Sequence, residues 1–465
     1  MRKIRLPRVA AILPLILTLL SPLIARGQDE TALDRYIAAP DPAYQYKIVS
    51  TTRKTGHTIF LVEMTSQSWR TEKEVDRPLW KHWLWVVKPD TLKSSKALIL
   101  ISGGTNDRPA PRAPNAALVA TAIATGTVTA EIGLVPNEPL RFTDENRDRS
   151  EDNIIAYSWE KFLRGGDDKW PLRLPMTKSV VRAMDTVVAI CSSPEGGSAK
   201  VDSFVVTGAS KRGWTTWSTA AVDKRVVAII PIVIDHLNTE PSLVHQFEAY
   251  GFFGQALKPY TDMKIPDWTG TAPFRALMKI EDPYEYRRRL TMPKFLINAT
   301  GDQFFMLDSS RFYFDDLPGT KYLRYVPNAD HSLKGSDAMA MVLTLYRAVV
   351  DAAPLPRFSW TVQADGAIRV TTDDQPTKVK LWQATNPESR DFRIESLGPV
   401  WKSTELAPQA DGTYTANVPA PAKGWSAFLV ELTYPSPGPA PYTFTTQVRI
   451  VPDTLPHKFQ RKAAP

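Results

Sequence analysis

Six apolar runs constrain the fold of this chain more than any other feature of its sequence. Each is apolar on both faces of an extended segment, and they lie at residues 96–102, 127–134, 203–207, 226–234, 294–298 and 322–326. Such runs are typical of strands buried in a parallel sheet. Segments with helical spacing lie between or after them, at residues 116–124, 173–192, 211–221 and 337–350. This alternation predicts an α/β fold with a doubly wound, mostly parallel sheet.

The segments before and within this series add two expectations. Residues 46–52, 58–64 and 79–87 are rich in β-branched and aromatic side chains, which predicts an antiparallel edge to the sheet. Residues 237–289 form an insertion rich in aromatic side chains. Insertions in this architecture emerge at the carboxyl ends of the strands, where ligands bind. We therefore expect a lid or pocket wall, with a packed subdomain as the alternative.

The last hundred residues have a different pattern. After Pro354 and Pro356, short alternating segments follow one another without helical spacing, separated by turn pairs such as Asp365-Gly366. This predicts a β-sandwich. We expect an α/β domain over residues 28–353, the β-sandwich over residues 354–452 and a disordered tail over residues 453–465.

The amino terminus has the order of a secretory signal. Arg2, Lys3, Arg5 and Arg8 precede an apolar run over residues 9–24. We expect a signal peptide over residues 1–27 and a periplasmic or secreted protein. The alternative is a membrane anchor, although a span needs about 20 uninterrupted apolar residues. We expect no stable membrane span after cleavage.

Charge and cysteine content narrow the function classes. Residues 1–27 carry five basic and no acidic side chains, so their removal lowers the formal charge from +8 to +3. Nucleic-acid binding needs a concentrated basic surface, and we expect no such partner. The single cysteine, Cys191, cannot form an internal disulfide, so the fold must depend on its apolar core.

A serine lies at the junction of a predicted strand and a predicted helix. Residues 205–213 read Val-Val-Thr-Gly-Ala-Ser-Lys-Arg-Gly, with small residues beside Ser210. In α/β-hydrolases a serine in this tight turn projects its hydroxyl above the sheet, next to the N–H groups of the helix. The usual G-x-S-x-G pattern is altered here, because Arg212 stands where the second glycine belongs and Gly213 follows one place later. The alternative is a serine that only caps the helix.

A serine nucleophile needs a base and an acid, which in this fold follow it in the order acid, then histidine. His331 follows the last apolar run and precedes the last long helix. Asp302 follows the run at residues 294–298, so we expect it to orient His331. Asp235, at the end of the run at residues 226–234, is the main alternative acid, and Asp308 and Asp330 are weaker alternatives.

Two further groups are candidates for binding the oxyanion or the substrate. Gly104 and Thr105 follow the first apolar run after Gly103 and offer backbone N–H groups. Lys211 and Arg212 directly follow the serine. Their charges suit either a substrate carboxylate or an internal acid, and the sequence leaves both open. The histidine spacing gives no metal motif, so we expect no metal and no cofactor.

Several blocks resemble one known family. Residues 151–157, 174–178, 208–214, 293–299 and 301–305 are similar, in this order, to segments of the PhoPQ-activated pathogenicity-related protein family, which includes the autocrine proliferation repressor proteins. The resemblance implies an exported α/β-hydrolase-like domain with a carboxyl-terminal β-domain. The pattern from Gly208 to Gly213 is also similar to that of glucuronoyl esterases, which implies that Lys211 assists the oxyanion.

Three function classes follow. The first is an exported serine hydrolase, an esterase acting through an acyl-enzyme on a small-molecule or glycan ester. The second is a catalytically silent binding or signalling protein on the same scaffold. The third, a structural envelope protein, leaves Ser210 and His331 without a role.

Overall fold

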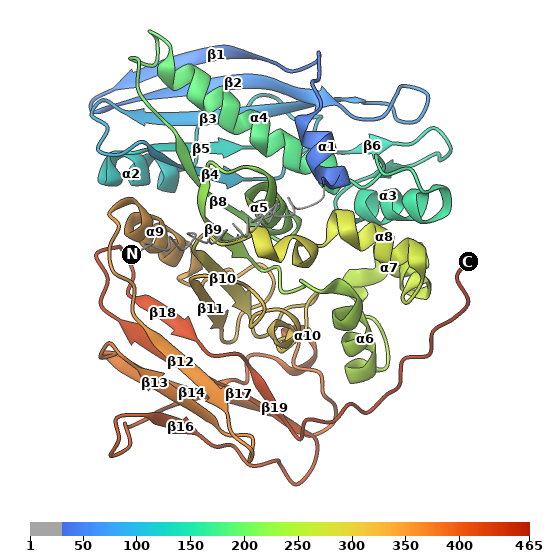
Figure 1. Cartoon of the computed structure of the whole chain (residues 1–465), viewed down its shortest axis with the longest axis vertical. Helices are drawn as coiled ribbons and strands as arrows, with labels where there is room; N and C mark the ends of the chain where they lie inside the picture. The colour runs from blue at the N-terminus through green and yellow to red at the C-terminus, as the bar shows by residue number, and fades with distance from the viewer. Residues whose placement is uncertain (1–29) are drawn as a thin grey trace, which may run out of the picture.

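A nine-stranded sheet forms the centre of the α/β domain (Figure 1). The computed structural model describes residues 30–465, so the predicted signal peptide lies outside the described residues. The strand order is β1-β2-β3-β5-β4-β8-β9-β10-β11. The strands are β1 Gln45–Lys54, β2 His57–Ser68, β3 Leu79–Pro89, β4 Lys96–Ile101, β5 Val128–Ile132, β8 Ser203–Ala209, β9 Val226–Ile232, β10 Lys294–Ala299 and β11 Lys321–Val326. From β5 to β11 neighbouring strands are parallel, while β1, β2, β3 and β5 pair antiparallel. The mostly parallel sheet and its antiparallel edge are confirmed.

Helices cover both faces of this sheet. On one face, residues of α3 (Asp152–Gly165), α4 (Arg173–Ser192) and α5 (Lys211–Val222) share an apolar cluster with Val206 of β8. On the other, residues of α2 (Ala116–Thr125) and α9 (Ala338–Val350) share a second cluster with Val205. Adjacent strand residues point to opposite faces, and both are buried here. This is why the apolar runs are continuous.

The insertion after β9 is mostly helical and packs beside α3. Its helices are α6 Thr239–Tyr250, α7 Lys258–Asp262 and α8 Ala272–Glu281, and 3₁₀ turns join them. Helix α3 contacts both α7 and α8. The insertion thus stands beside the end of the sheet that carries the serine loop (Figure 1).

The carboxyl-terminal domain consists of two packed antiparallel sheets, as predicted. One holds β12 Phe358–Val362, β13 Ile368–Thr372 and β16 Tyr414–Ala416, and the other holds β14 Lys378–Asn386, β15 Lys402–Glu405, β17 Trp425–Tyr434, β18 Tyr442–Thr445 and β19 Arg449–Val451. Apolar residues of both sheets share the cluster that contains α9. The domain also contacts the last strand of the large sheet, because Thr445 Oγ1 accepts the Tyr325 N–H at 3.0 Å.

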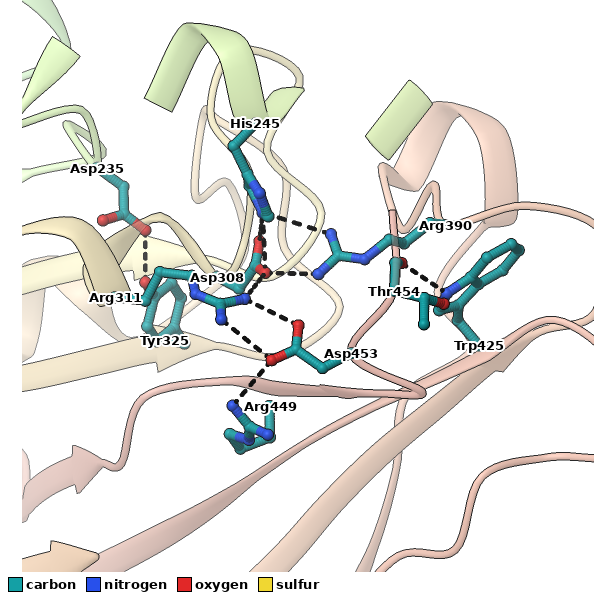
Figure 2. A network of polar contacts seen from close by, with 10 residues as sticks. All are labelled: Asp235, His245, Asp308, Arg311, Tyr325, Arg390, Trp425, Arg449, Asp453 and Thr454. Carbon is teal, nitrogen blue, oxygen red and sulfur yellow. Dashed lines mark hydrogen bonds and ion pairs between the residues drawn. The ribbon is translucent and has the colours of Figure 1, made fainter. Parts of the chain in front are cut away.

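A buried charge network joins the insertion, the α/β domain and the β-sandwich (Figure 2). Asp308, in the loop after β10, contacts His245 Nε2 of α6 at 3.0 Å. It accepts a 2.7 Å bond from Arg390 of the β-domain. Although burial raises it, the charges of Arg390 and His245 hold the pKa of Asp308 well below its usual range. The carboxylate therefore remains charged and fixes three parts of the chain to one another.

Residues of the carboxyl-terminal tail lie against helix α6 of the insertion. The His457 N–H donates to the Glu248 carbonyl at 3.0 Å, and the Phe459 ring lies against Phe247 and Phe253. Arg461 pairs with Glu240 at 2.9 Å. Three of these partners, Glu240, Phe247 and Glu248, lie on α6, which ends before Gly251. A single aromatic residue in a polar segment gives no periodic signal, so its docking could not be seen in the sequence.

No helix among residues 30–465 is both long and apolar enough to cross a bilayer.

We predict that Arg390→Met destabilises the protein strongly. The substitution leaves the Asp308 charge buried without its guanidinium, which costs about 3–5 kcal/mol of the free energy of unfolding. Arg357→Met is the matched control, because the Arg357 side chain is 74% exposed and pairs with surface acids, an interaction worth about 1 kcal/mol or less. Urea denaturation measures both variants. Equal losses for the two would contradict the role given to Arg390.

Candidate active site

Ser210 occupies a strained turn between β8 and α5. Its backbone has φ 57° and ψ −128°, a conformation that residues with side chains rarely adopt. The Ser210 N–H donates to the Ile232 carbonyl at 2.8 Å, which ties the turn to the neighbouring strand. The side chain makes no capping hydrogen bond to α5. The simple helix-cap interpretation of Ser210 is therefore wrong.

Two glycines let α5 approach the strands closely enough to form this turn. A Cβ at Gly208 would lie 2.8 Å from the Arg212 carbonyl oxygen. A Cβ at Gly213 would lie 2.9 Å from the Gly208 oxygen and 3.0 Å from the Ile232 oxygen. These three contacts are to backbone oxygens, which cannot move aside. Gly213 thus explains why the altered pattern, with its second glycine one place late, still makes the turn.

His331 and Asp302 are brought together from the two last strands of the sheet. His331 Nδ1 lies 2.8 Å from Asp302 Oδ2, and Asp302 Oδ1 accepts the N–H groups of Phe304 and Phe305 at 2.7 and 3.3 Å. In the neutral imidazole, a hydrogen bond from Nδ1 to this carboxylate leaves the lone pair on Nε2. Gln303 Oε1 holds the backbone of His331 at 3.0 Å. The imidazole is fixed in the form that a general base requires.

Ser210 and His331 are not hydrogen-bonded in this conformation. His331 Nε2 is buried and has no hydrogen-bond partner within the described chain. The rings of Phe304 and Phe305 lie 4.4 and 5.8 Å from the imidazole, measured between ring centroids. In ligand-free sites such bonds are often long and tighten only when substrate binds. Ser210, Asp302 and His331 follow the chain order and strand positions of a hydrolase triad. The hydrogen bond between the serine and the histidine is not formed.

The alternative acid Asp235 has other partners. Its two oxygens accept the hydroxyls of Tyr313 and Tyr325, at 2.6 and 2.5 Å. Burial raises the pKa of Asp235 to about 7. Within residues 30–465 no hydrogen bond joins Asp235 to His331, so of the two acids only Asp302 is paired with that histidine.

A pocket of mostly apolar lining opens beside Ser210. It is narrow, because the space that the centre of a water-sized sphere can reach inside it is about 40 Å³. The aromatic lining residues are Trp159, Trp214, Tyr260, Phe304 and Phe305, and the polar ones besides Ser210 are Asp152, Lys211 and His236. Tyr260 and several aliphatic lining residues come from the insertion, which therefore forms a pocket wall. His236 was missed in the sequence, because a histidine next to Asp235 carries no pattern of its own.

Lys211 and Arg212 both pair with internal acids. Lys211 Nζ lies 2.5 Å from Glu151 and 3.1 Å from Asp152, and its side chain is only 7% exposed. Arg212 holds Glu151 with two nitrogens at 2.8 and 3.0 Å and donates to the Val135 carbonyl at 2.6 Å. Neither cation is left free for a substrate carboxylate.

Glu138 completes this group of charges. It accepts the Glu151 N–H at 2.6 Å. Burial, with the charge of Glu151, raises the pKa of Glu138 to about 8. For Glu151 burial acts in the same direction, but Arg212 and Lys211 overcome it and hold the pKa at about 2. The adjacent cations Lys211 and Arg212 were the sequence signal here, and of the two interpretations left open, a substrate carboxylate or an internal acid, the structure shows the internal acids.

The candidate oxyanion loop lies next to Arg212. A Cβ at Gly103 would stand 2.4 Å from the Arg212 guanidinium, so this glycine makes room for that side chain. Gly104 has φ 145°. The carbonyl oxygen of the preceding residue, Gly103, accepts the Leu134 N–H at 2.9 Å. Gly104 and Thr105 line a separate hollow with Trp83 and Trp85, and are not among the residues that line the Ser210 pocket.

Within residues 30–465, no three His, Cys, Asp or Glu side chains are grouped so as to hold a metal ion.

Comparison with known proteins identifies a family, and it also finds solved structures that align with lower similarity. Residues 33–393 match the model of the PhoPQ-activated pathogenicity-related protein family. The chain is 36% identical to autocrine proliferation repressor protein A of Dictyostelium discoideum, over 95% of this chain and 94% of that protein. Among solved structures, an acetyl xylan esterase from Paenibacillus sp. R4 aligns with a TM-score of 0.49 at 14% identity, covering 70% of this chain and 95% of that one. Acetyl xylan esterase 1 from Thermoanaerobacterium sp. JW/SL YS485 aligns with a TM-score of 0.48 at 15% identity, covering 68% and 92%.

We predict that Gly213→Ala destabilises the protein by about 1–3 kcal/mol, since the added methyl group meets the backbone oxygens of Gly208 and Ile232 and the side chain of Ile234. Gly165→Ala is the control. It also lies in a helix, has open space around its Cβ position, and should gain up to about 1 kcal/mol from reduced chain entropy. Urea denaturation distinguishes the two. A neutral Gly213→Ala would show that α5 does not need this close approach.

Proposed function

The chain belongs to the PhoPQ-activated pathogenicity-related protein family, and we propose that it is a serine hydrolase that cleaves carboxylic esters through an acyl-enzyme. The observation that carries the proposal is the 2.8 Å bond between Asp302 and His331, at the ends of the two strands where an α/β-hydrolase carries its acid and base. The strained turn at Ser210 on the central strand is the third part of the same arrangement.

Each group has a defined task in this mechanism. Ser210 Oγ attacks the ester carbonyl carbon while His331 Nε2 takes its proton. Asp302 holds the imidazole and stabilises the positive charge that it gains. The N–H of Lys211, at the start of α5, faces the developing oxyanion, and an N–H of residues 103–105 is the second donor that we propose. His331 then gives the proton to the leaving alcohol, and water releases the acid.

His236 is the other histidine near Ser210, and it is the weaker base. It lines the same pocket, but burial lowers the pKa of its ring to about 4. No carboxylate is hydrogen-bonded to this ring among residues 30–465, so nothing fixes its tautomer as Asp302 fixes that of His331. A base that weak would take the serine proton less readily.

A second function, binding or signalling without turnover, is supported by two observations. His331 Nε2 is covered and has no hydrogen bond to Ser210. The Dictyostelium relative is named for repressing proliferation rather than for a reaction. On this alternative the aromatic pocket holds a ligand and Ser210 is not acylated.

We also propose that the protein is exported to the periplasm or beyond. The support is the order of basic and apolar residues over positions 1–27. The substrate is then a small-molecule or glycan ester outside the cytoplasm.

For the reaction, we predict that a fluorophosphonate probe labels the mature wild-type protein and does not label Ser210→Ala. A phosphonylated serine is the stable product of the same attack that begins ester cleavage. Ser359→Ala, at an exposed position on β12, is the control and should label like wild type. Labelling that survives Ser210→Ala would reject this nucleophile, and a wild type that is folded but never labelled would favour the binding function.

For export, we predict that the full chain expressed in a Gram-negative host is recovered from the periplasm with Gln28 as its first residue. Fractionation followed by amino-terminal sequencing measures both. Leu17→Arg, which places a charge inside the apolar run, should leave the uncleaved chain in the cytoplasm. Periplasmic recovery of a chain that still begins at Met1 would contradict cleavage, and cytoplasmic wild type would contradict export.

A further inference from the structure

The pocket beside Ser210 has the composition of a site for a flat apolar group. Five aromatic side chains line it, from α3, α5, the insertion and the loop after β10. Ile234, Leu243 and Leu257 add aliphatic surface. Aromatic rings bind other rings by stacking and by edge contacts in addition to the area that they bury. The lining therefore favours an aromatic ring over a sugar or a chain of polar atoms.

The charged side chains at the pocket are already neutralised by one another. Lys211 is paired with Glu151 and Asp152, and Asp152 also accepts the Tyr260 hydroxyl at 2.9 Å. An anionic group entering here would meet the Asp152 carboxylate and would have no free cation to compensate the loss of its hydration. The group that fits is uncharged.

The position of His331 decides which part of an ester enters. The imidazole must protonate the leaving alcohol, so the alcohol lies on the side of His331. Ser210, Phe304 and Phe305 line the pocket, whereas His331 contacts the two phenylalanine rings without being among the lining residues. Because the pocket holds the serine and not the histidine, we assign it to the acyl group.

His236 is the polar side chain of this pocket with hydrogen-bonding capacity to spare. Its ring is held edge-on by Trp214, with centroids 5.9 Å apart, and lies 5.4 Å from Phe305. Neither ring nitrogen is hydrogen-bonded to protein in the part of the chain that is described, and the side chain is not fully buried. A neutral imidazole offers one donor and one acceptor, which suits a hydroxyl group.

We infer that the Ser210 pocket binds an uncharged aromatic acyl group that carries a hydroxyl, and that His236 hydrogen-bonds to this hydroxyl and so determines the preference for it. This inference rests on the proposed esterase function. In the reaction, a bond forms between Ser210 Oγ and the acyl carbon, the bond from that carbon to the alcohol oxygen breaks, and the alcohol leaves with the serine proton. Water then releases a hydroxylated aromatic acid.

The test compares three methyl esters on the mature protein: 4-hydroxybenzoate, benzoate and the anionic monoester of succinate. For the wild type, we expect kcat/KM to be at least about 100-fold higher for the 4-hydroxybenzoate than for the succinate ester, and about 10-fold higher than for the benzoate, the value of one hydrogen bond. His236→Phe should lower the second ratio to about one, because neither ester then gains the hydrogen bond, and His236→Gln, which can still hydrogen-bond, should retain part of the ratio. His457→Phe, the same change on the tail, should leave both ratios as in the wild type.

The outcomes separate this inference from the proposed function. Ser210-dependent labelling with equal rates for the three esters, or faster cleavage of the succinate ester, overturns the inference and leaves the esterase proposal standing. A protein that neither labels nor cleaves any ester overturns the esterase proposal. Calorimetric titration with 4-hydroxybenzamide and benzamide then tests whether the pocket prefers a hydroxylated ring. About tenfold tighter binding of the hydroxylated amide, lost in His236→Phe, supports that preference. Equal or absent binding of the two amides rejects it.

Discussion

The approach of helix α5 to strands β8 and β9 is the constraint on which the site depends. Gly208 and Gly213 allow backbone to meet backbone with no side chain between them. This contact makes the turn tight and presents Ser210 at its outside. The same contact turns Lys211 and Arg212 inward, where their charges could not remain without partners. The acids Glu138, Glu151 and Asp152 are therefore a consequence of how closely the helix begins beside the sheet.

The sequence predicted those features that local patterns encode. Apolar runs on both faces indicated the parallel sheet, and the chain order of serine, aspartate and histidine placed Asp302 and His331 after the right strands, where the structure pairs them. Charge partners were beyond reach, because Glu138 and Arg212 are far apart in sequence and meet only in three dimensions. The contact of the tail with α6 and the position of His236 in the pocket could not be predicted for the same reason, since each depends on a contact with a distant segment.

The β-sandwich is part of the same unit as the site. Arg390 of the β-domain and His245 of the insertion bind one buried carboxylate, Asp308, six residues after the acid Asp302 (Figure 2). Displacing the β-domain would leave that charge buried without its guanidinium. The position of the pocket wall is thus linked to a domain that contributes none of the pocket lining.

The short segment from Asp302 to Phe305 has two tasks that cannot be separated. The N–H groups of Phe304 and Phe305 hold the carboxylate that orients His331, and the rings of the same two residues line the pocket. A substitution that reshapes the pocket here also shifts the backbone that holds Asp302 against His331. Relatives that bind other ligands should therefore differ in the helices of the insertion and keep residues 302–305. We expect the differences in specificity within the family to lie in residues 237–289.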